Sequence, residues 1–147
     1  CRYLYFPVSN SSTCTVTARI VSMAGGTTSA RAGVMIRETT ANNSRHSSML
    51  AERSGAWRYI YRTGIGSTAT GSTSSVVIKP YWVRLQRAGD VIRAYRSSDG
   101  STWVQNGTDQ PIAMASQVLG GLAVSSRANN ALALAAFDNV TIDPPLA

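Results

Sequence analysis

Apolar and polar residues alternate over most of this chain, in short runs that turn-forming residues separate. In "CTVTARIV", for example, Cys14, Val16 and Ala18 alternate with polar residues. A period of two puts successive side chains on opposite faces of a β-strand, and no long stretch shows the helical period. The expected strands are residues 2–8, 14–22, 31–38, 47–53, 56–63, 74–79, 81–87, 91–97, 102–105, 117–125 and 131–142. The pattern predicts an all-β chain, folded as a sandwich or barrel.

The length of 147 residues suits one domain with a real core. We expect residues 1–142 to form a single β-sandwich and residues 143–147, which contain a proline pair, to begin a linker. The chain starts inside an expected strand, which favours a module cut from a longer protein. The Gly- and Ser-rich segment 63–75 has no large apolar anchor besides Ile65, so we expect a mobile loop at the rim.

The first two expected strands look like a hairpin. Pairing them across "SNSST" places Val8 opposite Cys14 and Phe6 opposite Val16, so that both apolar sets share one face. Cys1 would then lie about 20 Å along the strand from Cys14, too far for a disulfide. We predict that the two cysteines are not bridged, that Cys14 is a small buried hydrophobic residue, and that Cys1 is available to a partner outside the chain.

A second hairpin is expected in "YWVRLQRAGDVIRAYRSSDGSTW", with a turn at residues 88–89. Leu85 then faces Ile92 on the core side. On the outer side this register places Trp82 across from Tyr95 and Arg84 across from Arg93. Two directly opposed arginines repel each other unless rings, carboxylates or a ligand lie between them.

Trp82, Arg84, Arg93 and Tyr95 are therefore the candidate ligand-binding residues. A sugar ring stacks its C–H face on an aromatic ring, and its hydroxyl groups accept hydrogen bonds from planar charged donors. The alternative is that the two rings only shield the arginines by cation–π contacts, or that another strand or a neighbouring domain covers them.

Two further expected strands also place arginines or aromatic side chains together on one face. In "AGVMIRE" and the arginine before it, Arg31 and Arg37 point away from the core side. In "AWRYIYR", Trp57, Tyr59 and Tyr61 share one face, which we expect to be the core, with an exposed aromatic platform as the alternative.

The formal net charge is +7, and Lys79 is the only lysine. Such a surplus favours acidic partners, here an acidic or sulfated polysaccharide. The arginines are spread along the chain without a basic run, which argues against nucleic acid. No apolar stretch approaches the roughly 20 residues that cross a bilayer, so we expect no membrane insertion.

The stretches "AGVMIRE", "YWVRL", "SSDGSTW" and "FDNV" together resemble the concanavalin A-like domains of the DUF1349 type, over nearly the whole chain. These modules occur in secreted bacterial and archaeal proteins. The resemblance implies a two-sheet antiparallel jelly-roll sandwich located outside the cell or at its surface, with a function mostly inferred as carbohydrate binding. Members usually begin with one more strand segment, which this sequence lacks.

Two aspartates invite specific interpretations. "SSDGSTW" resembles the Asp-box turns of sialidase propellers, so Asp99 is expected to accept main-chain N–H groups, Gly100 to take a positive φ and Trp103 to cover the corner. Asp138 shares a strand face with apolar residues and needs a partner. Similar jelly-roll modules hold a structural Ca²⁺ at the final strand, which makes Asp138 a candidate ligand; a satisfied turn or bulge aspartate is the alternative.

The sequence argues against catalysis. His46, the only histidine, is expected in the polar loop "TTANNSRHSS", and no nucleophile elbow or metal-ligand cluster occurs. Glu38 and Glu52 could form a glycosidase pair, but they lack the clustered acidic strand motif of concanavalin A-like glucanases. N-glycosylation sequons occur at Asn10, Asn42, Asn106 and Asn139.

These observations favour a non-catalytic, extracellular carbohydrate-binding module without a cofactor. The alternative is a structural or adhesive repeat of a surface layer, fibre or multidomain stalk, whose outer faces bind neighbouring domains or copies of the chain.

Overall fold

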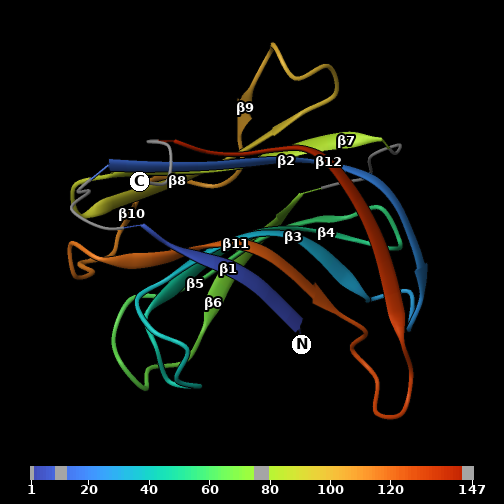
Figure 1. The fold of residues 1–147 in the computed structure, drawn as a ribbon, viewed down its shortest axis with the longest axis horizontal. Coiled ribbons are helices and arrows are strands. Elements are labelled where there is room, and N and C mark those ends of the chain that lie inside the picture. The colour runs from blue at the N-terminus through green and yellow to red at the C-terminus, as the bar shows by residue number, and fades with distance from the viewer. Residues whose placement is uncertain (1, 9–12, 75–79, 144–147) are drawn as a thin grey trace.

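Two antiparallel sheets packed face to face make up the computed structural model, which describes residues 2–8, 13–74 and 80–143 (Figure 1). Sheet A has the strand order β1-β11-β3-β4-β5-β6, and sheet B has the order β10-β8-β7-β2-β12, with β9 paired to β8. The strands are β1 (Arg2–Val8), β2 (Thr13–Gly25), β3 (Arg31–Arg37), β4 (His46–Glu52), β5 (Trp57–Arg62), β6 (Thr70–Ser74), β7 (Tyr81–Ala88), β8 (Val91–Ser97), β9 (Val104–Gln105), β10 (Gln110–Pro111), β11 (Val118–Ser125) and β12 (Ala133–Asp143).

The core lies between the sheets and follows the two-residue period of the sequence. Val34 and Ile36 of β3 meet Leu85 of β7 there, all fully buried. Trp57 and Tyr59 are buried as well, and Tyr61 packs against this core, so the prediction that this aromatic face points inward is confirmed. The edge of the Trp57 ring meets Tyr81, with ring centroids 4.4 Å apart, which adds a favourable aromatic contact to the burial.

The predicted hairpin between the first two strands is wrong. β1 pairs with β11 in sheet A, whereas β2 lies between β7 and β12 in sheet B. The apolar alternation of β1 fits pairing with β2 or with β11 equally well, so it could not predict which of the two strands is the partner. The close approach of β1 depends on Gly121 of β11, where a Cβ atom would lie 1.9 Å from the Leu4 carbonyl oxygen. Gly33 of β3 permits a similar approach to Met49 of β4.

Cys14 is a buried free thiol, which confirms its predicted role as a small core residue. It lies opposite Arg87 of β7, and burial raises the pKa of the thiol to about 11. The hairpin argument against a disulfide no longer applies, and Cys1 lies outside the described residues, as does Asn10. Among the other sequons, Asn42 and Asn139 are exposed and Asn106 is buried.

The segment 63–75 is only partly a loop. Thr70–Ser74 form β6, which pairs with β5 at the edge of sheet A. This strand carries no apolar alternation, so the sequence pattern could not reveal it. Of the strand expected at 74–79, only Ser74 belongs to the described residues. The short strand β10 was also missed, because two residues are too few to show a period.

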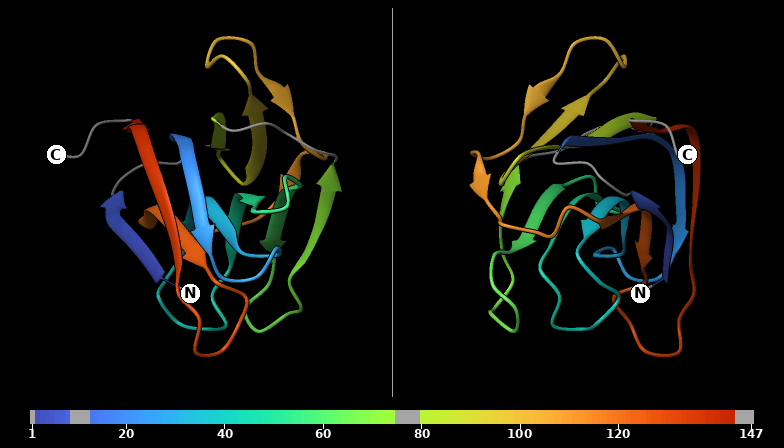
Figure 2. Two further views of the ribbon diagram at one scale, coloured as in Figure 1. Left: turned by 90° about the vertical axis from the view of Figure 1, so that its right-hand side faces the viewer. Right: turned by 60° about the vertical axis from the view of Figure 1, so that its left-hand side comes forward.

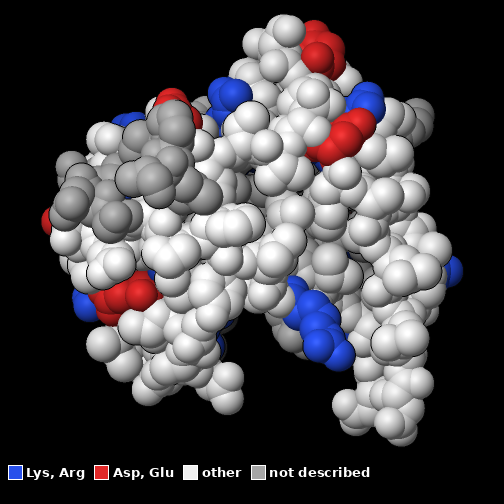
Figure 3. All heavy atoms as spheres, viewed as in Figure 1, with Lys and Arg blue, Asp and Glu red and all other residues white. Residues whose placement is uncertain are grey.

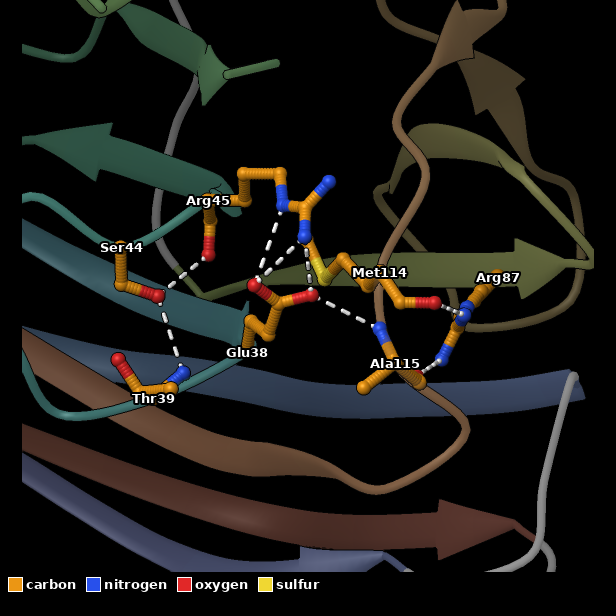
Figure 4. A network of polar contacts seen from close by, with 7 residues as sticks. All are labelled: Glu38, Thr39, Ser44, Arg45, Arg87, Met114 and Ala115. Carbon is orange, nitrogen blue, oxygen red and sulfur yellow. Dashed lines mark hydrogen bonds and ion pairs between the residues drawn. The ribbon is translucent and has the colours of Figure 1, made fainter. Parts of the chain in front are cut away.

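A partly buried polar network holds the chain where it crosses from sheet B to sheet A, between β10 and β11 (Figure 4). The Arg87 guanidinium, on the inner side of sheet B, donates to the carbonyl oxygens of Met114 and Ala115, both at 2.7 Å. The Ala115 N–H donates to Glu38 at 2.8 Å, and Arg45 binds the same carboxylate. One crossing segment is thereby tied to both sheets.

His46 begins β4 and is buried, so its predicted place in a polar loop is wrong. It lies between Arg37 and Arg62 on the neighbouring strands. Burial, followed by the charges of these two arginines, lowers the pKa of His46 from 6.5 to about 4. The imidazole is therefore neutral in the folded protein at neutral pH.

Replacing Arg87 with methionine should lower the free energy of unfolding by about 2 kcal/mol, because a buried acceptor left without its donor costs roughly 1–3 kcal/mol. Urea unfolding at pH 7 measures the change. Arg53→Met is the matched control: Arg53 also donates to two carbonyl groups, those of Gly25 and Gly26, but is exposed. Its effect should stay within about 0.5 kcal/mol. Equal losses in the two variants would contradict a stabilising role for the polar network.

The low pKa of His46 predicts a pH dependence of stability. The unfolded chain takes up a proton near pH 6.5 and the folded chain only near pH 4, so the stabilisation is complete above pH 6.5 and is lost as the pH falls towards 4. The loss should be roughly 3 kcal/mol. Urea unfolding at pH 7, 5.5 and 4.5 should show a flatter dependence for His46→Gln. A variant with the same pH dependence as the original protein would refute this assignment.

Candidate functional site

The segment between β8 and β10 stands out from the outer face of sheet B and includes β9 (Figures 1 and 2). The turn that starts it matches the prediction for "SSDGSTW". Asp99 Oδ1 accepts hydrogen bonds from the main-chain N–H groups of Ser101 and Thr102, both at 2.8 Å, and Gly100 has a φ of 78°. These hydrogen bonds lower the pKa of Asp99. The turn places Trp103 over the outer face of the sheet, beside Trp82.

The β7–β8 hairpin has the predicted faces but a different register. Its two-residue turn is Gly89–Asp90, so Arg84 lies opposite Tyr95 and Gln86 opposite Arg93. Gly89 has a φ of 62°, as a type II′ turn requires at its first central position. A shift of the pairing by two positions keeps every side chain on its face but removes the predicted opposition of Arg84 and Arg93.

A groove of about 470 Å³ lies on this outer face, which we call the sheet B groove. The residues that line it come from β2, β7, β8, β12 and the protruding segment. They are Thr15, Thr17, Arg84, Gln86, Tyr95, Trp103, Thr141 and Asp143. Each of these side chains carries at least one hydrogen-bonding group.

Arg84 is fixed within this groove. Its Nε atom donates to Thr17 Oγ1 at 3.0 Å, and its guanidinium carbon lies 3.9 Å from the centre of the Trp103 ring. Trp103 also packs edge to face with Trp82: the ring centroids are 6.3 Å apart and the interplanar angle is 84°. The guanidinium thus forms a flat, oriented donor surface on an aromatic support.

The four predicted ligand-binding residues all lie on the outer face of sheet B, but they play different parts. Arg84 and Tyr95 line the groove. Trp82 packs edge to face with Trp103 and does not line the groove. Arg93 forms an ion pair with Asp109 at 3.0 Å. Arg84 makes a cation–π contact with Trp103, a ring that was not part of the predicted set.

Sequence reasoning missed six groove residues. Trp103 was assigned to a turn corner, although an aromatic ring after an Asp-box-like turn can reach the sheet beside it. Thr15 and Thr17 were visible as the polar face of β2, but only the pairing of β2 with β7 shows that this face adjoins Arg84. The other missed residues are Gln86, Thr141 and Asp143.

Asp138 is a satisfied bulge aspartate. Its carboxylate accepts two hydrogen bonds from Arg19, one of them from Nε at 2.6 Å, and the strand register shifts on either side of it. The contact with Arg19 lowers the pKa of Asp138. No group of three or more His, Cys, Asp or Glu side chains that could hold a metal ion occurs within residues 2–8, 13–74 and 80–143. The prediction that Asp138 is a calcium ligand therefore has no support from the geometry.

Glu38 and Glu52 do not form a catalytic pair. Glu38 follows β3 and is bound to Arg45, whereas Glu52 ends the antiparallel strand β4 and is bound to Arg58. The two carboxylates lie at opposite ends of these strands, about 20 Å apart for a strand of this length. Glycosidase pairs lie within about 10 Å.

In the part of the chain that the structure describes, no helix is long and apolar enough to cross a membrane. No protein-family model matches the sequence, and a comparison with curated proteins finds no match either.

Solved structures do match the fold. One is a functionally unknown protein from Saccharomyces cerevisiae, with 17% identity and a TM-score of 0.75, over 99% of this chain and 75% of that one. Another is the GH43 BlXynB protein from Bacillus licheniformis, with 14% identity and a TM-score of 0.67; 95% of this chain matches only 32% of that protein. A third is the alginate lyase from Alteromonas sp. 272, with 10% identity and a TM-score of 0.51, over 94% of this chain and 77% of the lyase. At such identities the likeness concerns the fold alone, and the chain has the all-β, concanavalin A-like jelly-roll fold.

Proposed function

We propose that this chain is a non-catalytic carbohydrate-binding module and that the sheet B groove holds the sugar. The observation that carries the proposal is the composition of the groove, in which every lining side chain has a hydrogen-bonding group and two are aromatic. A polyhydroxylated ligand matches such a surface, because its hydroxyl groups need donors and acceptors while its C–H faces need flat apolar support.

The arrangement suggests how a sugar ring would be held. The ring would lie over Tyr95 and the guanidinium of Arg84, which Trp103 and Thr17 keep in place. Since Arg84 is already oriented, little side-chain entropy is lost when it donates to a hydroxyl group. Gln86 and Asp143 line the same groove and would accept hydrogen bonds from the ligand.

The carboxylates support a non-catalytic role. Five of the seven are held by partners: Glu38, Glu52, Asp99, Asp109 and Asp138. Asp143 alone lines the groove among the residues that the structure describes, whereas glycoside hydrolysis generally needs a pair of carboxylates.

The proposal includes where the module is located. The motifs that resemble DUF1349-type modules support a location outside the cell, beside other domains of a longer protein. An alginate lyase shares the fold, which gives a polysaccharide ligand a precedent at the level of fold analogy.

Binding to a panel of immobilised neutral and acidic polysaccharides tests the groove. Tyr95→Ala and Arg84→Gln should each weaken binding of the recognised glycan at least tenfold, because each removes a ring or donor that contacts the sugar. Tyr5→Ala is the matched control, since Tyr5 is an exposed tyrosine on sheet A, away from the groove. Unchanged affinity in both folded groove variants would refute this site.

The runner-up function is a structural or adhesive repeat, and one observation favours it. Leu4 and Phe6 share a face of edge strand β1 with the buried Val8, yet they are 61% and 46% exposed. An uncovered apolar face on an edge strand is a typical site for pairing with another chain.

If the chain self-associates through this edge, its mass in size-exclusion chromatography with light scattering should rise with concentration. Leu4→Ser together with Phe6→Ser should then restore the monomer, while the exposed pair Ile65→Ser and Val104→Ser should leave association unchanged. A monomer at all concentrations, with or without reductant, would rule out this reading.

A further inference from the structure

The outer face of sheet A is hollowed. Figure 3 shows a hollow between two lobes with basic atoms visible in it, on the side of the molecule where sheet A lies in Figure 1. The strands of this sheet place Arg31, Arg37, Arg58 and Arg62 on the face that points away from the core, as the alternation of β3 and β5 predicts. We call this surface the hollow face.

The arginines at one end of the hollow face are structural. Arg37 donates to the carbonyl oxygens of Thr39 and Ala41, and Arg62 donates to that of Asn42 at 2.6 Å. These contacts hold the loop between β3 and β4. Although Arg62 Nε and the neighbouring His46 Nδ1 are buried without partners, Arg62 also donates to the carbonyl oxygen of Ser44 at 3.2 Å.

The other end is different. Arg31, Arg58 and Arg127 line one pocket of about 340 Å³, together with Ile60 and residues 69–71. Glu52, beside Arg31 across the β3–β4 pair, is the nearby counter-charge, and its carboxylate is bound to Arg58. The three arginines and this one carboxylate, which Arg58 already binds, leave a net charge of about two positive units at the pocket.

Arg31 and Arg127 of this pocket have side-chain donors without a hydrogen-bond partner among the described residues. Arg31 Nε is buried and has no hydrogen-bond partner. The Arg127 side chain makes no hydrogen bond or ion pair with any of the described residues. Burial lowers the pKa of Arg31, and the charges of Arg127 and Arg58 lower it further. Buried donors are rarely left unpaired, and like charges gathered around a cavity are stabilised when an anion enters it.

We propose that the Arg31–Arg58–Arg127 pocket binds an oxyanion, the carboxylate or sulfate group of an acidic polysaccharide, at a site separate from the sheet B groove. The planar guanidinium of Arg31 presents two parallel N–H donors to such a group. Arg127 lines the pocket from the loop before β12. Arg58 lines it from β5 and adds a positive charge there while it binds Glu52.

The surroundings favour a glycan over a nucleic acid. Between this pocket and the arginines at the other end, the floor of the hollow face is formed by the apolar side chains of Met35, Leu50 and Ala123, with Ile60 beside them. A nucleic acid strand carries a charge about every 3.4 Å, so most of its phosphates would lie over this apolar floor. A sugar ring instead offers apolar C–H faces to the floor and its acidic group to the pocket.

Titration calorimetry with dextran sulfate, polygalacturonate, neutral dextran and single-stranded DNA tests the proposal, with inorganic sulfate as the smallest probe. Arg31→Met and Arg127→Met should each weaken binding of a sulfated or uronate polymer at least tenfold. Arg53→Met is the control for loss of one positive charge and should weaken it less than twofold. Arg127 is exposed, so its variant keeps the test valid if Arg31→Met unfolds.

The two faces can be told apart in the same experiment. Tyr95→Ala should leave the binding of inorganic sulfate unchanged, whereas Arg127→Met should weaken it and should leave binding in the sheet B groove unchanged. Equal losses of affinity for the acidic polymer in Arg127→Met and Arg53→Met would show that only the overall positive charge matters, and would refute the pocket as a binding site. Tighter binding of DNA than of both acidic glycans, with the same dependence on Arg127, would overturn the polysaccharide assignment.

Discussion

The hydrogen bonds of Arg87 to the crossing segment hold the two sheets together where the chain changes from one to the other. They fix the carbonyl groups of Met114 and Ala115 against sheet B, while Glu38 holds the Ala115 N–H from sheet A. This segment leads directly into β11, on which β1 and β3 both pair. The order of sheet A, and with it the hollow face, therefore depends on a guanidinium that the core encloses.

The two-residue period predicted most strands and nearly all faces, because the side-chain direction in a strand follows from local geometry alone. It could not assign partners. The alternation of β1 is compatible with β2 and with β11, and the pairing with β11 includes a close approach of Gly121 to Leu4, which are 117 positions apart. In the β7–β8 hairpin a turn placed one residue too early moved the register by two, so the faces of Arg84 and Tyr95 were right and their cross-strand partners were wrong.

The candidate sites show the same limit. Arg31 and Arg37 stand in equivalent positions of one strand, and nothing in the sequence separates them. The structure does, because the carbonyl groups around Arg37 satisfy its donors, whereas Arg31 faces two other arginines. Likewise Trp103 reaches the sheet B groove only because a turn that is distant from β2 in sequence folds back over it.

The close approach of strands at Gly33 and Gly121 has a consequence for how such a molecule can change. A Cβ atom at either position would overlap the backbone of the adjacent strand, so neither position of the floor can acquire a side chain without moving the sheet. New ligand preferences on this face would therefore have to arise at positions other than these two, for example in the surrounding loops, where Arg127 is exposed. The fold thus fixes two positions of this face as glycine, and selection for a new ligand would act on the residues around them.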